Sequence, residues 1–69
     1  MGSVYKVIEL VGTSENSWEE AAKLAIDTAG KSLKNLRIAE VSKLDLRLDD
    51  DGKVAAYRTK LKVSFKYED

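Results

Sequence analysis

Residues 17–34 read SWEEAAKLAIDTAGKSLK, and this is the one span whose apolar residues recur at helical spacing rather than at the two-residue spacing of a strand. The apolar stripe consists of Trp18, Ala22, Ala25, Ala29, Leu33 and Leu36, widened by Ile26. Intervals of three or four residues place such side chains on one face of a helix. We therefore predict a single helix over residues 17–34, with a shallow, alanine-rich face that lets a sheet pack closely.

The two ends of this helix are also indicated by the sequence. Ser17 can accept from the backbone N–H of Glu20 while the Glu20 side chain reaches back, which is a capping box. Asn35 can take the left-handed conformation that ends a helix. Trp18 is expected to staple the helix entrance to the sheet, with stacking on a ligand as the alternative.

The composition points to a small protein that needs support from other copies. The chain has 69 residues, 12 basic and 12 acidic side chains, and no cysteine or histidine. A domain of this size buries only about 60% of the surface exposed by its unfolded chain. Without disulfides or histidine-bound metals, oligomerisation is the expected source of stability. We predict one domain, residues 1–69, that assembles with copies of itself.

The same composition disfavours several functions. The missing cysteine and histidine remove thiol catalysis, serine–histidine triads and histidine-ligated zinc, so we predict that the protein is not an enzyme. Zero net charge disfavours a general nucleic-acid or membrane-surface binder. No stretch resembles a signal peptide or a membrane span, which indicates the cytoplasm.

The segment before the helix, residues 4–11 (VYKVIELV), has apolar side chains on both faces of a predicted strand. A strand of this kind is covered on both sides. The helix can cover one side, and we expect a second chain to cover the other. Residues 12–16 are predicted to form the turn into the helix, with Gly12 at a position of positive φ.

The segment after the helix, residues 37–49, alternates in hydropathy but changes phase midway. Its apolar residues are Ala39 and Val41, followed by Leu44, Leu46 and Leu48. A regular strand cannot place odd and even positions on one face. Either a bulge near Ser42 and Lys43 re-aims the strand, or its second half faces a different neighbour.

Asp49–Gly52 (DDDG) then predicts a hairpin turn between antiparallel strands. Residues 53–67 form the last predicted strand, with one apolar face toward the helix and one basic face. The apolar face carries Ala55, Tyr57, Leu61, Val63, Phe65 and Tyr67, with Thr59 among them; the other carries Arg58, Lys60, Lys62, Ser64 and Lys66. The basic row is a solvated face that blocks edge-to-edge aggregation, or it pairs with Glu9, Glu40 or Asp45, or it lines the interior of an assembly. The predicted fold is α+β, in the order β-α-β-β, with a three-stranded antiparallel sheet curled around one helix.

The acidic turn also invites a metal-site interpretation. Asp49, Asp51 and Gly52 echo an EF-hand loop, but the first and last ligand positions of such a loop would be Arg47 and Arg58. We favour a solvated hairpin, with a looser metal site formed by Asp49, Asp50 and Asp51 as the alternative.

Four segments together resemble the dodecin family. They are VYKVIELVGTS at 4–14, WEEAA at 18–22, AEV at 39–41 and YRTKLKVSF at 57–65. The resemblance implies a β-α-β-β protomer that assembles into a hollow homododecamer. In many dodecins, stacked pairs of flavins, FMN or riboflavin, bind at subunit contacts and are stored without turnover.

The resemblance also implies which positions form the ligand pocket, namely Ile38, Glu40, Asp45 and Arg58. Ile38 stands where flavin-binding dodecins have a stacking tryptophan, Arg58 where they have a glutamine, and Asp45 where bacterial flavin binders have an arginine. The chain is similar to a dodecin subgroup with aliphatic and arginine residues at the first two of these positions, for which calcium binding has been proposed. The implied ligand is therefore flavin, another anion or calcium, and the pocket can also be empty.

Overall fold

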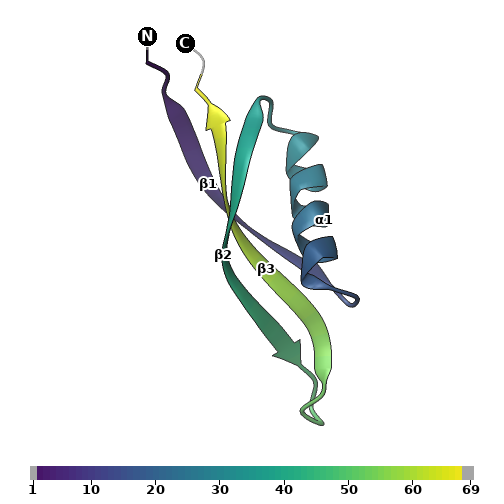
Figure 1. Cartoon of the computed structure of the whole chain (residues 1–69). Coiled ribbons are helices and arrows are strands. Elements are labelled where there is room, and N and C mark those ends of the chain that lie inside the picture. The colour runs from purple at the N-terminus through teal and green to yellow at the C-terminus, as the bar shows by residue number, and fades with distance from the viewer. Residues whose placement is uncertain (1, 68–69) are drawn as a thin grey trace.

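The computed structural model describes residues 2–67; Met1, Glu68 and Asp69, which belong to the predicted domain 1–69, lie outside the described residues. The chain forms β1 (Tyr5–Ser14), α1 (Trp18–Gly30), β2 (Leu36–Leu48) and β3 (Val54–Lys66). The three strands pair antiparallel in the order β1-β3-β2, and α1 lies across one face of this twisted sheet (Figure 1). The predicted β-α-β-β fold is confirmed.

The phase change in β2 is a bulge at Ser42. Val41 pairs with Leu61 and Lys43 pairs with Lys60, so Ser42 has no partner in the register, and its hydroxyl donates to the carbonyl of Lys60 at 3.1 Å. The extra residue turns the later leucines onto the same face as the earlier apolar residues. That face carries Ala39, Val41, Leu44 and Leu46, which pair with odd-numbered residues of β3. The bulge interpretation is confirmed, and a further register shift places Leu48 opposite Val54 on the other face.

The helix begins as predicted, but its capping bonds differ. The Ser17 hydroxyl accepts from the N–H of Glu20 at 3.0 Å. The Glu20 carboxylate does not return to Ser17; it accepts from the hydroxyl of Ser14 and from Nδ2 of Asn16, the latter at 2.6 Å. The return half of the predicted capping box is therefore wrong, because the Ser17 N–H is already directed at the Ser14 hydroxyl, 3.4 Å away.

The helix ends at Gly30, four residues before the predicted end at Lys34. Glycine is a poor helix former, and from Lys31 onward the backbone continues in hydrogen-bonded turns instead. Asn35 is left-handed as predicted, with φ 63°, but it directs the chain into β2 rather than capping the helix. Leu36, assigned to the helical stripe from the sequence, is the first residue of β2. None of the helical structure within residues 2–67 has the length and apolar character needed to cross a membrane.

Gly12 lies inside β1 rather than in a turn, so the predicted turn over residues 12–16 is wrong for its first three residues. Its backbone does not have a positive φ, which Gly52 alone among the glycines of residues 2–67 adopts. A Cβ at Gly12 would lie 2.0 Å from the carbonyl oxygen of Ala21, which is fully buried. Glycine is needed here because the helix backbone approaches the strand.

The core of one copy is small. Within residues 2–67 the buried apolar side chains are Ala21, Ala56, Leu61 and Val63. The molecule is elongated, measuring 54 × 20 × 15 Å, with a Cα radius of gyration of 14.3 Å. A compact chain of this length would have a radius of gyration of about 11 Å. Much of the apolar surface of a single copy is therefore left exposed.

Candidate ligand-binding face of the sheet

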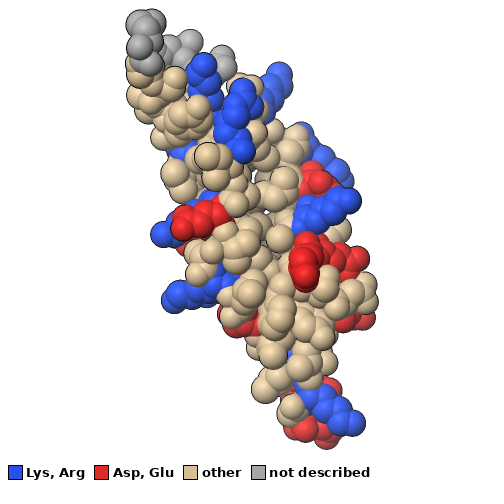
Figure 2. Space-filling model, viewed as in Figure 1, with Lys and Arg blue, Asp and Glu red and all other residues tan. Residues whose placement is uncertain are grey.

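The two faces of the sheet differ in what covers them. Odd-numbered residues of β3 face α1, since the Thr59 hydroxyl donates to the carbonyl of Trp18 at 2.9 Å and Tyr57 meets the Trp18 ring edge-on at 5.2 Å. Even-numbered residues of β3 therefore lie on the opposite face, here called the helix-free face. Its cross-strand rows are Val7–Ser64–Ile38, Glu9–Lys62–Glu40, Val11–Lys60–Lys43 and Thr13–Arg58–Asp45. Charged side chains are spread over the visible surface and separated by uncharged residues (Figure 2).

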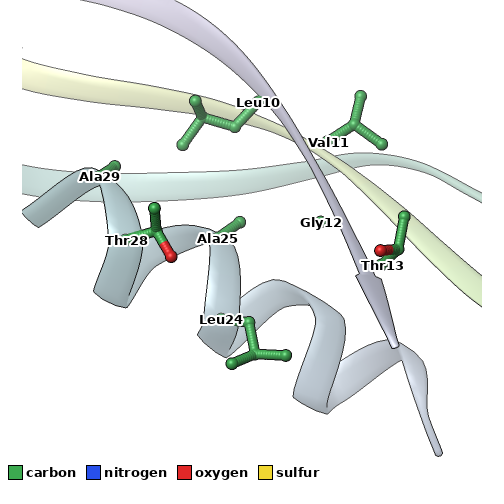
Figure 3. A pocket seen from close by; sticks show the side chains of 8 residues that line it. All are labelled: Leu10, Val11, Gly12, Thr13, Leu24, Ala25, Thr28 and Ala29. Atoms are coloured by element: carbon green, nitrogen blue, oxygen red, sulfur yellow. The ribbon is translucent and has the colours of Figure 1, made fainter. Parts of the chain in front are cut away.

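Among the hollows that border the helix, two lie on the covered face between the helix and an outer strand. One, of about 320 Å³, lies between β1 and α1, where Gly12 faces the helix beside Ala25 (Figure 3). The other, of about 290 Å³, lies between α1 and β2 and is lined mainly by Trp18, Val41 and Leu44. Val41 and Leu44 are 52% and 51% exposed. The helix therefore leaves apolar surface uncovered along both edges of the sheet.

The four predicted pocket residues share the helix-free face, but one copy does not bring them all together. Asp45 and Arg58 are in contact, whereas Glu40 is two rows and Ile38 three rows away. Each row advances the strand by two residues, so Ile38 and Asp45 lie roughly 20 Å apart. Ile38 is 68% exposed. A pocket that uses all four positions would need more than one copy.

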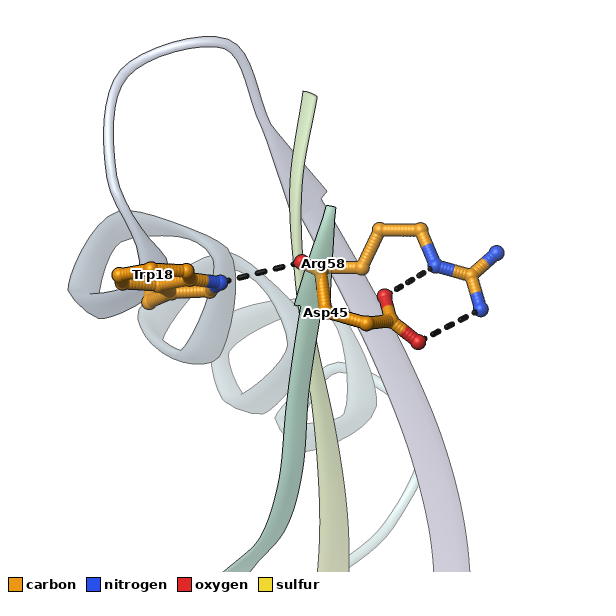
Figure 4. A network of polar contacts seen from close by, with 3 residues as sticks. All are labelled: Trp18, Asp45 and Arg58. Carbon is orange, nitrogen blue, oxygen red and sulfur yellow. Dashed lines mark hydrogen bonds and ion pairs between the residues drawn. The ribbon is translucent and has the colours of Figure 1, made fainter. Parts of the chain in front are cut away.

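Asp45 and Arg58 form a two-point ion pair across β2 and β3 (Figure 4). Arg58 Nε donates to Asp45 Oδ1 at 2.7 Å and its terminal nitrogen donates to Oδ2 at 3.3 Å. The hydrogen bonds from Arg58 hold the pKa of Asp45 below its usual value, and the Asp45 carboxylate raises the pKa of Arg58. Of the pairings predicted for the basic row, the one to Asp45 is confirmed.

The backbone of Asp45 is fixed from the covered face. Trp18 Nε1 donates to the Asp45 carbonyl oxygen at 3.1 Å, so the helix entrance is tied to the strand that carries the ion pair (Figure 4). This bond, together with the edge-on contact to Tyr57, confirms that Trp18 staples the helix to the sheet.

A hollow of about 360 Å³ lies beside Arg58 where β1 ends. It is lined by Thr13, Ser14, Glu15, Arg47, Ala56 and Arg58. Sequence reasoning did not place Arg47 or Thr13 near Arg58. The signal that would have found them is the register, which puts Arg47 opposite Ala56 and Thr13 opposite Arg58 once the bulge at Ser42 is fixed.

The acidic hairpin tip is built around Asp49. One carboxylate oxygen of Asp49 accepts from the N–H groups of Asp51 and Lys53, both at 2.9 Å, and Gly52 has the positive φ that the turn requires. Across residues 2–67 no group of three acidic, histidine or cysteine side chains is arranged to hold a metal ion. One carboxylate oxygen of Asp49 therefore already accepts two hydrogen bonds within the turn.

Comparison with known proteins identifies the family. The dodecin family model matches residues 4–68. The chain is 50% identical over 64 residues to calcium dodecin from Mycobacterium tuberculosis, covering 93% of this chain and 89% of that protein. It is 41% identical to dodecin from Thermus thermophilus, covering 100% and 99%. The crystal structure of the Mycobacterium tuberculosis protein, described as a calcium-chelating antigen with a novel calcium-binding site, superposes with a TM-score of 0.84 at 48% identity, covering 96% and 93%. The chain belongs to the dodecin family.

Proposed function

We propose that residues 1–69 form one domain of a non-enzymatic binding protein whose copies assemble into a hollow dodecameric shell. The observation that carries this proposal is the exposed apolar surface. Within residues 2–67, twelve large apolar side chains are more than 40% exposed, on both faces of the sheet, on the helix and beside the strand ends; they are Val4, Tyr5, Val7, Val11, Leu24, Ile38, Val41, Leu44, Leu46, Leu48, Val54 and Tyr67. A soluble monomer rarely leaves so much apolar surface in contact with water. Copies of the chain would cover it.

Calcium is the ligand that we propose first, on the strength of the similarity to calcium dodecin. Calcium takes six to eight oxygen ligands. Because residues 2–67 of one copy contain no group of three suitable side chains, the carboxylates would come from neighbouring copies. Glu40 on the helix-free face and Asp50 at the hairpin tip are exposed and suited to such shared sites.

Flavin is the second candidate, supported by family membership. Ile38 offers no aromatic ring on which the isoalloxazine system could stack. The binding free energy therefore loses about 1 kcal/mol per stacked contact, in addition to any change in buried area. We therefore expect FMN and riboflavin to bind more weakly here than to a dodecin with an aromatic residue at this position.

Light scattering and native mass spectrometry of the purified protein test the assembly and its retained ligand together. About twelve copies are expected, and a monomer or dimer would overturn the shell.

Calorimetric titration of calcium tests the ligand. We expect binding heat when calcium is added to the assembled protein, and a raised melting temperature. An assembly that gives no heat with calcium and melts unchanged after chelation would exclude the calcium proposal and leave the shell standing.

A further inference from the structure

The positive charge of Arg58 already has a counter-ion within the chain. Two guanidinium nitrogens donate to the two oxygens of Asp45. Lys60, the next residue along the helix-free face of β3, also attracts the same carboxylate. The Asp45 carboxylate therefore occupies one edge of the Arg58 guanidinium, at which an external anion could otherwise pair.

Space for such an anion exists next to the pair. The hollow beside Arg58 has Ala56 among its lining residues and is bordered by Arg47 and Thr13, and its volume of about 360 Å³ is ample for a phosphate group. Arginine guanidinium groups bind phosphate through paired hydrogen bonds. Glu15 also borders the hollow, so two acidic groups, Glu15 and Asp45, offset the two arginines. The arginines around the hollow could bind an anion, but the two acidic groups cancel their positive charge.

Given the proposed binding function, we propose that Asp45 is a specificity-determining residue whose carboxylate acts as an internal counter-ion and keeps phosphate-bearing ligands away from Arg58. A ligand phosphate must either displace the Asp45 carboxylate or pair with the other N–H groups of the guanidinium, and in both cases it meets the negative charge of Asp45. A ligand without negative charge loses nothing at this position. The staple from Trp18 fixes the Asp45 backbone, and the two hydrogen bonds from Arg58 orient its carboxylate on the helix-free face.

The test compares inorganic phosphate, FMN and riboflavin, since FMN is riboflavin with a phosphate added. Asp45→Asn keeps the side-chain shape and removes the charge. We expect it to bind phosphate and FMN about tenfold more tightly than the wild type, with riboflavin unchanged. Arg58→Gln added to Asp45→Asn should abolish the gain. Asp27→Asn, which removes the same charge from the exposed side of α1, should change phosphate affinity by less than about twofold.

Several outcomes would overturn the proposal. These are an unchanged phosphate affinity in Asp45→Asn, an equal gain for riboflavin and FMN, or a gain that survives Arg58→Gln. If Asp45→Asn does not assemble, Asp45→Ala provides the same comparison. The wild-type protein provides a test without any substitution. If it bound FMN tenfold more tightly than riboflavin, the proposal that Asp45 excludes phosphate-bearing ligands would be refuted. Because Asp45 and Arg58 belong to one copy, the phosphate titration remains decisive even if light scattering refutes the shell.

Discussion

The covered face and the helix-free face belong to the same three strands, yet they are completed in different ways. On the covered face, α1 meets Gly12 backbone to backbone and buries Leu61 and Val63 to 2% and 1% exposure. On the helix-free face, Val7 and Val11 remain 57% and 53% exposed among charged side chains. The helix covers the centre of one face but leaves Val41 and Leu44 half-exposed at its edge, whereas no element within residues 2–67 covers the other face. The buried core of one copy therefore lies on the covered side of the sheet, and the proposed ligand positions lie on the other.

The largest expected effect comes from Gly12→Ala, which acts on the covered face. The added Cβ would collide with the carbonyl oxygen of Ala21, and neither backbone can move without shifting the helix. We expect a loss of about 3 kcal/mol in the free energy of unfolding, measured by denaturant titration followed through Trp18 fluorescence. Gly30→Ala is the matched control, because nothing lies within 4 Å of its added Cβ. It should stabilise by about 0.5–1 kcal/mol, and equal losses in both variants would contradict the role given to Gly12.

A valine pair compares the two faces directly. Val63→Ala on the covered face should cost about 2.5 kcal/mol, because it leaves a cavity in the core. Val7→Ala on the helix-free face should cost less than about 0.5 kcal/mol in an isolated copy, since Val7 is 57% exposed there. In an assembly that covers Val7, the cost should rise toward about 1.5 kcal/mol. Denaturation at protein concentrations above and below the dissociation range measures this change, and a cost for Val7→Ala independent of concentration would count against coverage by copies.

The start of the helix that completes the covered face gives a smaller effect. Ser17→Ala removes the hydroxyl that accepts from the Glu20 N–H. We expect a loss of about 1 kcal/mol in the free energy of unfolding. Ser32→Ala, in the exposed turn after α1, is the control and should change stability by less than about 0.3 kcal/mol. A loss of similar size in both variants would show that the effect is not capping.

Features set by neighbouring residues were easier to predict from the sequence than contacts between separate elements. Ser17, the hairpin turn and the bulge near Ser42 are local signals, and each depends on residues close to one another in the chain. The sequence predicts a turn at Gly12 because glycine is common in turns. The structural reason for this glycine is its close contact with Ala21, which depends on packing between strand and helix and leaves no local signal in the sequence. The ion pair between Asp45 and Arg58 was one option among several. Choosing it requires the exact position of the bulge, because one residue of slip moves Asp45 to the other face.

Acid titration gives the smallest effect and separates two carboxylates that lie on opposite sides of the sheet. The pKa of Glu20 is lowered by hydrogen bonds from Ser14 and then Asn16, and that of Asp45 is lowered mainly by hydrogen bonds from Arg58. A lowered pKa in the folded state means that the unfolded chain binds more protons. These bonds therefore stabilise the protein above the unfolded pKa values of about 4, and the stabilisation is lost as the pH falls further.

Glu20→Gln and Asp45→Asn should each flatten the fall in melting temperature below pH 4, measured by thermal denaturation. Salt distinguishes the two carboxylates, because the donors to Glu20 are neutral whereas Arg58 is charged. At 1 M salt, where the screening length is about 3 Å, the effect of Asp45→Asn should shrink and that of Glu20→Gln should persist. Equal sensitivity to salt would mean that the two sites are stabilised in the same way. In that case Asp45 would not act as the counter-ion of Arg58, and the helix-free face would lose the feature that sets it apart from the covered one.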